Sequence, residues 1–410
     1  AENGNEEWSF KNCLATFTKL ENDTDLKGDF HGNDGPIRVR RHPVEEWTED
    51  AVAFNQGFQD LGFQVTEDHN DPDSTGVGPI PFNTIDRIRQ STAVGYINPA
   101  RNRLNLTLRG DCTVHRVLFA EKTAVGVEVE SGGELFKVYG NEIIISGGSI
   151  GSPQLLMLSG VGPAPHLNEL GIPVVVDLPG VGQSLRDHPQ VNVTWKTKDS
   201  YQHDRAGSKR VITVGIRYTA DGSDLHNDML IHQTSILFPN MYFVGDEEEM
   251  YQGVGMTAWL YLAKGIGELK LRSKDPTEQP DLNYNYFREK EDLRRMRECV
   301  RMCASVGAGD AYSEVIAERI QPTDEQLEND DALDSWLKQN ARTSHHITST
   351  CRMGPGSDPA SVVDQYGKVH GVNGLRVGDA SIMYDCVRAN TNVPTMMIGE
   401  KIAEFIKLSK

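Results

Sequence analysis

The sequence lacks three features that mark particular classes of protein. No run approaches the roughly 18 consecutive apolar residues that a membrane-spanning helix needs. Lys and Arg number 41 against 59 Asp and Glu, a formal charge of −18. The basic excess required for non-specific binding of nucleic acid or anionic membranes is therefore missing. Residues 1–8 have neither the basic start nor the apolar core of a secretory signal peptide. We expect a protein with no membrane span and no nucleic-acid partner.

Cysteine is sparse, and its six residues form no CxxC motif. Cys299 and Cys303 are four residues apart in a predicted helix, a spacing compatible with a metal site. No further His or Cys pair completes a ligand set, so we interpret both as core residues and expect no metal. Unpaired thiols are typical of a reducing compartment, which predicts a cytoplasmic protein.

A further absence concerns the glycine loop of dinucleotide sites. Such a site needs a strand, GxGxxG, a helix and an acidic residue about 20 positions on. Residues 146–151 follow a strand, but their glycines are spaced G-G-x-x-G, and glycines at 160, 162 and 171 interrupt the path to Asp177. We therefore favour a close backbone approach as their role over a stand-alone cofactor loop.

At 410 residues the chain is too long for a single hydrophobic core, so we expect two or three folding units. Residues 1–80 are predicted to be helical or irregular, with a helix over 47–61 ended by Gly62. Four short strands are then expected, at 104–108, 114–119, 125–129 and 143–145. They lead into a helix ending near residue 158, with Pro153 in its first turn.

The second half begins with alternating apolar and polar runs over 190–280, which predict an antiparallel sheet with one face toward solvent or ligand. Helices are predicted over 289–306 and 323–339, the latter starting with a capping box of Thr323 and Gln326. A strand at 375–377 and a helix over 395–407 finish the chain. This order indicates that the chain leaves one unit and later re-enters it.

Four segments resemble motifs of the glucose–methanol–choline (GMC) oxidoreductase family, and they occur in the family's order. The segments are Gly148-Ser-Ile-Gly-Ser-Pro-Gln-Leu-Leu-Met-Leu-Ser-Gly-Val-Gly162, Pro179-Gly-Val-Gly-Gln-Ser-Leu-Arg-Asp-His188, Ser344-His-His-Ile-Thr-Ser-Thr-Cys-Arg-Met-Gly354, and Gly374-Leu-Arg-Val-Gly-Asp-Ala-Ser381 with its continuation over 388–400. The resemblance implies FAD as cofactor and the oxidation of a small-molecule alcohol to an aldehyde or ketone.

The resemblance also implies an α/β (α+β) fold, in which an FAD-binding domain is interleaved with an antiparallel-sheet substrate domain. On this basis residues 81–189 and 341–410 belong to the FAD-binding domain, 190–340 form the substrate domain, and 1–80 follow the FAD loop. Trp8 and the helix after it resemble a region that follows the Rossmann loop in family members. About a hundred residues are thus expected to be missing, either because the enzyme is split or cleaved or because this chain is a fragment. A companion chain or fragment carrying GxGxxG is expected.

Catalytic roles follow from the same resemblance. Alcohol oxidation by hydride transfer needs a base for the hydroxyl proton, and a neutral imidazole with a pKa near 6.5 suits that task. His346 with Thr350 fits the family pattern of a histidine, two residues, Gly or Ser, and Thr, so His346 is the expected base. His345 is expected to line the site or pack nearby. Asn390 matches the family's second position and is expected to hydrogen-bond the substrate oxygen.

Flavin contacts are implied at five matching positions. The main chain of Val114 is expected near the adenine, Asp379 and Ala380 near the ribityl and phosphate groups, and Thr391 and Asn392 near the flavin ring. The final helix would direct its N-terminal dipole toward negative charge developing on the ring. His188, in contrast, is interpreted as structural.

Two alternatives stay open at this point: a cofactor-free binding module, and a non-redox hydroxynitrile-lyase-like member of the same fold. No marked aromatic cage for a quaternary ammonium is visible, so the sequence alone does not support choline as the alcohol. Nor does it separate oxygen from a quinone or protein as electron acceptor.

Overall fold

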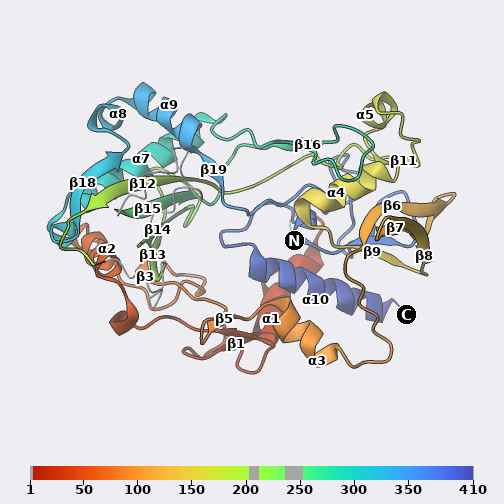
Figure 1. Ribbon diagram of the computed structural model, residues 1–410, viewed down its shortest axis with the longest axis horizontal. Helices are drawn as coiled ribbons and strands as arrows, with labels where there is room; N and C mark the ends of the chain where they lie inside the picture. Colours follow the sequence, from red (N-terminus) through yellow and green to blue (C-terminus); the bar gives the residue numbers. More distant parts are fainter. Residues whose placement is uncertain (1–2, 203–211, 236–252, 410) are drawn as a thin grey trace.

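The computed structural model describes residues 3–202, 212–235 and 253–409. Their buried hydrophobic side chains form two large clusters, each assembled from segments far apart in the sequence. The first cluster uses residues from 47–77, 191–260 and 287–337, and the second from 20–37, 117–185, 269–271 and 351–405. The chain therefore passes repeatedly between two lobes, which Figure 1 shows side by side. This interleaving is the arrangement expected from the family resemblance.

The first lobe is built on a sheet that has seven strands among the described residues. In spatial order the strands are β18 (Ile316–Gln321), β12 (Pro189–Thr197), β15 (Gly253–Leu260), β14 (Met229–Thr234), β13 (Val214–Tyr218) and β3 (Gly76–Pro79), with β19 (Arg342–Thr343) also paired to β12. All of these pairings are antiparallel, as predicted for this region.

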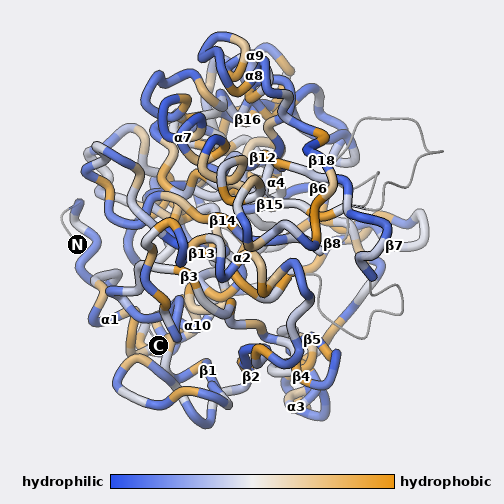
Figure 2. The backbone as a smooth tube through the Cα atoms, turned by 90° about the vertical axis from the view of Figure 1, so that its left-hand side faces the viewer, coloured by the Kyte–Doolittle hydropathy of each residue, from blue (hydrophilic) through white to orange (hydrophobic). Residues whose placement is uncertain are grey.

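Helices cover this sheet: α2 (Glu49–Asp60), α7 (Lys290–Gly307) and α9 (Asp330–Asn340) contact its strands. Of the two faces predicted for this sheet, toward solvent or toward ligand, solvent is wrong for the central strands, since every residue of β14 and β15 is buried. Figure 2 shows these strands inside the molecule, beneath more hydrophilic segments. The polar side chains of β14 and β15 are therefore enclosed rather than facing open solvent.

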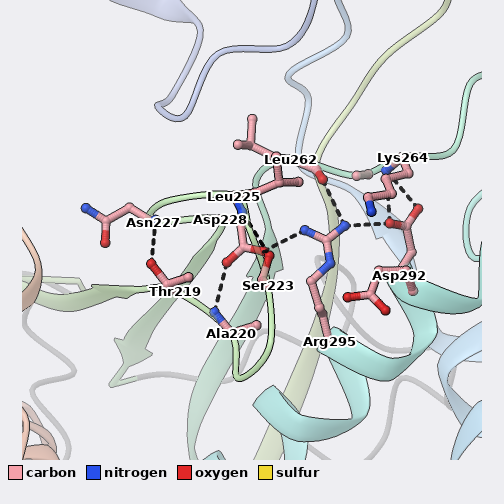
Figure 3. Close-up of polar contacts among 12 residues, drawn as sticks. Thr219, Ala220, Ser223, Leu225, Asn227, Asp228, Leu262, Lys264, Asp292 and Arg295 are labelled. Atoms are coloured by element: carbon pink, nitrogen blue, oxygen red, sulfur yellow. Dashed lines mark hydrogen bonds and ion pairs between the residues drawn. The ribbon is translucent and has the colours of Figure 1, made fainter.

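A buried ionic cluster ties α7 to the ends of the central strands (Figure 3). The guanidinium of Arg295, which is fully buried, donates to Asp228 and Asp292, both at 2.7 Å, and to the carbonyl of Leu262 at 2.9 Å. The carbonyl of Asp228 accepts the N–H of Tyr261 at 2.9 Å. The cluster thus fixes the segment that leaves β15.

The second lobe contains a parallel pair, β9 (Ile143–Ile145) and β20 (Leu375–Val377). Helix α4 (Gly148–Leu158) follows β9, and helix α10 (Asn392–Leu408) packs on α1 (Phe10–Leu20). A three-stranded antiparallel sheet completes the lobe, formed by β6 (Thr113–Ala120), β7 (Thr123–Ser131) and β8 (Glu134–Tyr139). Both lobes combine helices and sheet, consistent with the expected α/β (α+β) class.

Short elements join these parts. They are η1 (Glu6–Trp8), β1 (Glu21–Asp23), β2 (Ile37–Val39), η2 (Val44–Glu46), β4 (Thr84–Ile85), β5 (Ile88–Arg89), η3 (Ala93–Ile97), α3 (Asn98–Ala100), β10 (Val161–Gly162), α5 (Ala164–Glu169), β11 (Val176–Asp177), β16 (Glu268–Lys270), β17 (Asp281–Asn283), η4 (Asp310–Tyr312), α8 (Asp324–Glu328) and η5 (Ala380–Ile382). No helix of the described segments combines the length and apolar composition needed to cross a membrane.

Three expectations about local structure are wrong: the strand at 104–108, the single helix over 323–339, and the place of Pro153 in the first turn of α4. Residues 104–108 form no strand and are exposed, because no neighbouring strand among the described residues pairs with them. The single helix expected over 323–339 is two helices, α8 and α9, because Asn329 leaves helical geometry and caps α9. The capping box of Thr323 and Gln326 at the start of α8 is present as predicted.

Pro153 lies inside α4 rather than in its first turn. Proline has no N–H, so the carbonyl four residues earlier loses its helical partner. Here that carbonyl belongs to Ser149, and it accepts a hydrogen bond from the hydroxyl of Thr350 at 2.7 Å. A residue of the third motif therefore compensates the helix defect in the first motif.

Candidate active site

Strand pairing brings the second and third motifs together. Pro189 pairs with Thr343 where β12 meets β19, and an isolated bridge joins Arg186 to Thr348. The two chain segments therefore run antiparallel, and His188 meets His346 between them. The Nδ1 atoms of the two imidazoles lie 3.0 Å apart, and His188 and His346 are 0% and 7% exposed.

Asp187 holds this junction in place. One carboxylate oxygen accepts the backbone N–H groups of His188 at 2.8 Å and His346 at 3.0 Å. The other accepts the hydroxyl of Thr343 at 2.6 Å and the hydroxyl of Tyr286. Burial raises the pKa of Asp187, and these hydrogen bonds oppose that rise. The buried carboxyl group is thus satisfied by the two segments that it joins.

Aromatic side chains from β15 and its end surround the two histidines. The register Gln190↔Trp259 places Trp259 beside the start of β12, and its ring centroid lies 5.2 Å from that of His346. The ring of Tyr261 lies 4.7 Å from that of His188. The Tyr261 hydroxyl also donates to the amide oxygen of Asn390 at 3.4 Å. Tyr261 therefore connects the expected second site residue to the histidine pair.

The adjacent histidines at 345 and 346 have opposite environments. His345 is exposed and adopts a positive φ of 62°, whereas His346 is buried. Burial lowers the pKa of His346 from 6.5 to about 4, and the nearby charge of His345 adds to this effect. His346 is therefore neutral at neutral pH, the state in which an imidazole can accept a proton.

Asp379 binds the start of α4 through hydrogen bonds. Its carboxylate accepts the N–H of Gly148 at 3.0 Å and the hydroxyl of Ser152 at 2.5 Å, and it caps η5 through the N–H of Ser381 at 2.8 Å. Gly148 has φ of +75°, which suits glycine. A protein carboxylate thus already occupies the helix N-terminus that lies within the G-G-x-x-G segment. Ala380 is buried next to it, and its carbonyl accepts the N–H of Ser349 at 3.3 Å.

The start of α10 offers donors for an anionic group. Thr391 is buried at its N-cap, while Asn390 and Asn392 are exposed, and no side chain caps this 17-residue helix. Uncapped N–H groups at a helix N-terminus favour negative charge, so the donor chemistry here fits a reduced flavin ring. Val114 lies in β6, an edge strand among the described residues. An edge strand leaves alternate main-chain groups free to bind a ligand.

Sequence reasoning missed several residues of this cluster. His188 was interpreted as structural, and Asp187, Trp259 and Tyr261 were given no role. The Asp187-His188 pair stands directly before a strand within a family motif, and that position was the one available indication. Nothing in the sequence indicates that Trp259 contacts His346 and Tyr261 contacts His188, because strand register decides these contacts.

A second group of potential ligands lies elsewhere, where Glu21, Asp23 and His31 place donor atoms within 4.8 Å of one another. The guanidinium of Arg41 binds Asp23 at 2.8 Å and Asp68 at 2.6 Å. An arginine therefore already supplies positive charge to Asp23, one of the two carboxylates of the group, and we assign no metal ion there.

Comparison with known families gives two matches. The sequence matches the GMC oxidoreductase family over residues 1–190, its N-terminal region, and over residues 263–399, its C-terminal region. The two matches contain every site residue expected from the sequence.

Individual relatives agree with this assignment. The chain is 35% identical over 426 residues to the mitochondrial choline dehydrogenase of Homo sapiens, an alignment that covers 98% of this chain and 70% of the human protein. It is 32% identical over 423 residues to the oxygen-dependent choline dehydrogenase of Photobacterium profundum, covering 99% of this chain and 74% of the relative.

Solved structures share the fold. Formate oxidase of Aspergillus oryzae superposes with a TM-score of 0.90 at 22% identity, covering all of this chain and 80% of the other. Pyridoxine 4-oxidase of Mesorbium loti superposes with a TM-score of 0.89 at 22% identity, covering 98% and 78%.

Proposed function

This chain belongs to the GMC oxidoreductase family of FAD-dependent enzymes acting on CH–OH groups, and on that premise we propose a specific chemistry for its site. The enzyme oxidises a small-molecule alcohol to an aldehyde or ketone, with His346 as the base and Asn390 as a donor to the substrate oxygen. The observation that carries this proposal is the environment of His346. It is buried, it is neutral at neutral pH, and its hydrogen bonds to the carboxylate of Asp187 and to the ring of His188 hold it in place.

FAD, held by the residues named below, would supply the acceptor for the hydride that leaves the carbinol carbon. His346 takes the hydroxyl proton. The carbonyl product forms when the C–H bond breaks and the hydride leaves. Burial raises the pKa of Tyr261, so its hydroxyl stays protonated and donates to the amide oxygen of Asn390. This bond orients the amide and leaves its NH₂ group free to donate to the oxygen on which negative charge develops.

For the cofactor we propose contacts from two elements of the second lobe. Thr391 and Asn392 would contact the flavin ring through the start of α10, and Val114 would contact the adenine through the free edge of β6. Asp379 and Ala380 would stand near the ribityl and phosphate groups. The bonds of Asp379 to α4 support a positioning role for that carboxylate.

We further propose that residues 190–340 form the substrate domain, which their share of the first hydrophobic cluster supports. Residues 203–211 and 236–252 of that range lie outside the described residues. We keep the other predicted ranges as proposals: residues 81–189 and 341–410 form the FAD-binding domain, and residues 1–80 follow the FAD loop. The 190–340 range also supplies Trp259 and Tyr261 to the site.

The pyrophosphate anchor is proposed to come from a segment carrying GxGxxG other than residues 146–151. Support comes from the carboxylate of Asp379, which already accepts the N–H of Gly148 at the start of α4. Mass analysis of the purified yellow enzyme would test this. Finding no GxGxxG segment in that sample would contradict it.

A cytoplasmic location is proposed from the six cysteines, all of which are free thiols. Unpaired thiols are typical of reducing compartments. Fractionation of the producing cells would test this proposal, and recovery of the enzyme from an oxidising compartment would contradict it.

Choline is the first alcohol to test, because relatives named choline dehydrogenase are 32–36% identical to this chain. The rings of Trp259 and Tyr261 beside the histidine pair could also contribute to cation recognition. The matched control is 3,3-dimethylbutan-1-ol, which has the shape of choline without its charge. Equal turnover of both would contradict a quaternary-ammonium site.

The proposal as a whole is tested by mixing the flavin-loaded enzyme with alcohol without oxygen and following flavin bleaching. Replacement of His346 by Ala should slow bleaching by about 10²- to 10⁴-fold, the usual contribution of a general base. The exposed neighbour provides the control, since His345→Ala should keep nearly the full rate. Unchanged bleaching in His346→Ala would refute the role of the base, and flavin that no alcohol bleaches would favour the lyase alternative.

A further inference from the structure

We infer that His188 is a positioning residue that fixes the tautomer of His346 and leaves the lone pair of His346 Nε2 available for the hydroxyl proton. This inference rests on the proposed function, because it explains how the proposed base is held in its active form. It concerns a residue that the sequence alone suggested was merely structural. The argument follows one line of hydrogen bonds from a backbone carbonyl to the base.

The line begins at the carbonyl of Val387, which lies 2.9 Å from Nε2 of His188. A carbonyl oxygen only accepts hydrogen bonds, so Nε2 must carry the hydrogen. His188 is fully buried, and burial holds its pKa well below the usual value. A neutral imidazole carries one hydrogen, which leaves Nδ1 of His188 as an acceptor.

The next link is the 3.0 Å contact between the two Nδ1 atoms. Since Nδ1 of His188 accepts, Nδ1 of His346 must donate. The hydroxyl of Ser344 agrees, because it donates to the carbonyl of His188 at 2.7 Å and can accept from His346 Nδ1 at 3.2 Å. With the hydrogen on Nδ1, the Nε2 atom of neutral His346 bears the lone pair, and no hydrogen bond found among the described residues engages it.

The thiol of Cys386 does not reverse this direction. Its sulfur lies 3.0 Å from Nε2 of His188, and burial raises the pKa of the thiol to about 12, so it keeps its hydrogen. That hydrogen is directed toward the carbonyl of His346 at 3.7 Å. The opposite tautomer of His188 would place an unprotonated Nε2 against the carbonyl of Val387, with two acceptors facing each other at 2.9 Å.

The direct test is ¹⁵N NMR of the flavin-loaded full enzyme with labelled histidine, because the ring nitrogen shifts distinguish the two neutral tautomers. The spectra of His346→Asn and His188→Asn assign the two rings. We expect His346 to carry its hydrogen on Nδ1. A hydrogen on Nε2 of His346 in the unmodified enzyme would overturn the inference, whatever the variants do.

Two substitutions at position 188 separate positioning from packing. In His188→Asn the side-chain oxygen can take the place of Nδ1 as acceptor, whereas His188→Leu fills space without one. We expect His188→Leu to populate the other tautomer of His346 and to lower kcat by about a hundredfold, within the contribution of a general base. KM should change much less, and His188→Asn should retain the tautomer and most of the rate.

Equal losses in both variants, or an unchanged His346 tautomer in His188→Leu, would overturn the inference. The proposed function fails in a different way. If His346→Ala bleaches flavin at full rate, His346 is not the base, even where its tautomer in the unmodified enzyme depends on His188.

Discussion

The proposed active site has a base side around His346 and a flavin side at the start of α10. The two sides differ in how many contacts within the chain hold their side chains in place. On the base side, His346 is buried and bonded to Asp187 and His188. On the proposed flavin side, Asn392 is exposed, and no side chain caps α10, the helix that begins at this residue. The difference indicates that contacts within the chain hold His346 in place, whereas the proposed flavin contact of Asn392 depends on the cofactor. Substitutions should therefore affect folding on the base side and cofactor binding on the flavin side.

The largest expected effect on stability is at Arg295, whose cluster holds the segment leading from Tyr261. Arg295→Met leaves Asp228 and Asp292 buried without their cation, and such a loss costs about 3–5 kcal/mol. Urea denaturation followed by circular dichroism measures the change.

The neighbouring Arg294 provides the matched control on the same helix. Its ion pairs with Glu291 and Glu298 are partly exposed, and such pairs contribute only about 0–1 kcal/mol. Similar losses of unfolding free energy in Arg294→Met and Arg295→Met would show that burial does not make the Arg295 ion pairs contribute more to stability.

Asp187 should have the next largest effect. Asp187→Ala removes the acceptor of the backbone N–H groups of both histidines and frees the segment that carries His346. We expect kcat to fall by about a hundredfold, the scale on which small misplacements of a reacting group act. The anaerobic rate of flavin bleaching measures it. A variant that folds and retains the full rate would contradict the idea that contacts within the chain hold His346 in place.

The pH profile should show a smaller and graded effect. Because burial lowers the pKa of His346 to about 4, its neutral form dominates above that value. The bleaching rate constant should stay level from neutral pH to below 6.5 and then fall as the pH drops through the pKa of His346. A fall that begins above pH 7 would show that His346 is not held in the environment described.

The smallest effect on stability is expected at the flavin side. Asn392 is exposed, so Asn392→Ala should change the free energy of unfolding by no more than about 0.5 kcal/mol. Flavin affinity should weaken if Asn392 contacts the ring, and fluorescence titration with FAD measures it. Loss of stability without loss of flavin affinity would contradict the expectation that substitutions on the flavin side affect cofactor binding rather than folding.

Much of the fold follows from local patterns. The strands at 143–145 and 375–377, the helix α7 and the capping box at Thr323 all occur where residue patterns predict them. The order of elements already indicated that the chain leaves one unit and re-enters it, and the resemblance to family motifs agreed with this interleaving. His346 and Asn390 were also found through the resemblance, because neither stands out by composition.

What could not be predicted depends on contacts between distant segments. Residues 104–108 have the composition of a strand, but a strand needs a partner. Pro153 is tolerated inside α4 because Thr350 supplies a hydrogen bond from nearly 200 residues away. His188 meets His346 through the pairing of β12 with β19, a register that sequence patterns do not specify.

The most direct test of the central claim is chemical rescue of His346→Ala in the complete flavin-loaded enzyme. If His346 removes the hydroxyl proton, added imidazole should restore part of the anaerobic bleaching rate in proportion to its concentration. The unmodified enzyme and His345→Ala should not respond to imidazole. A slow variant that imidazole leaves unchanged, or a variant as fast as the unmodified enzyme, would contradict the assignment of His346 as the base.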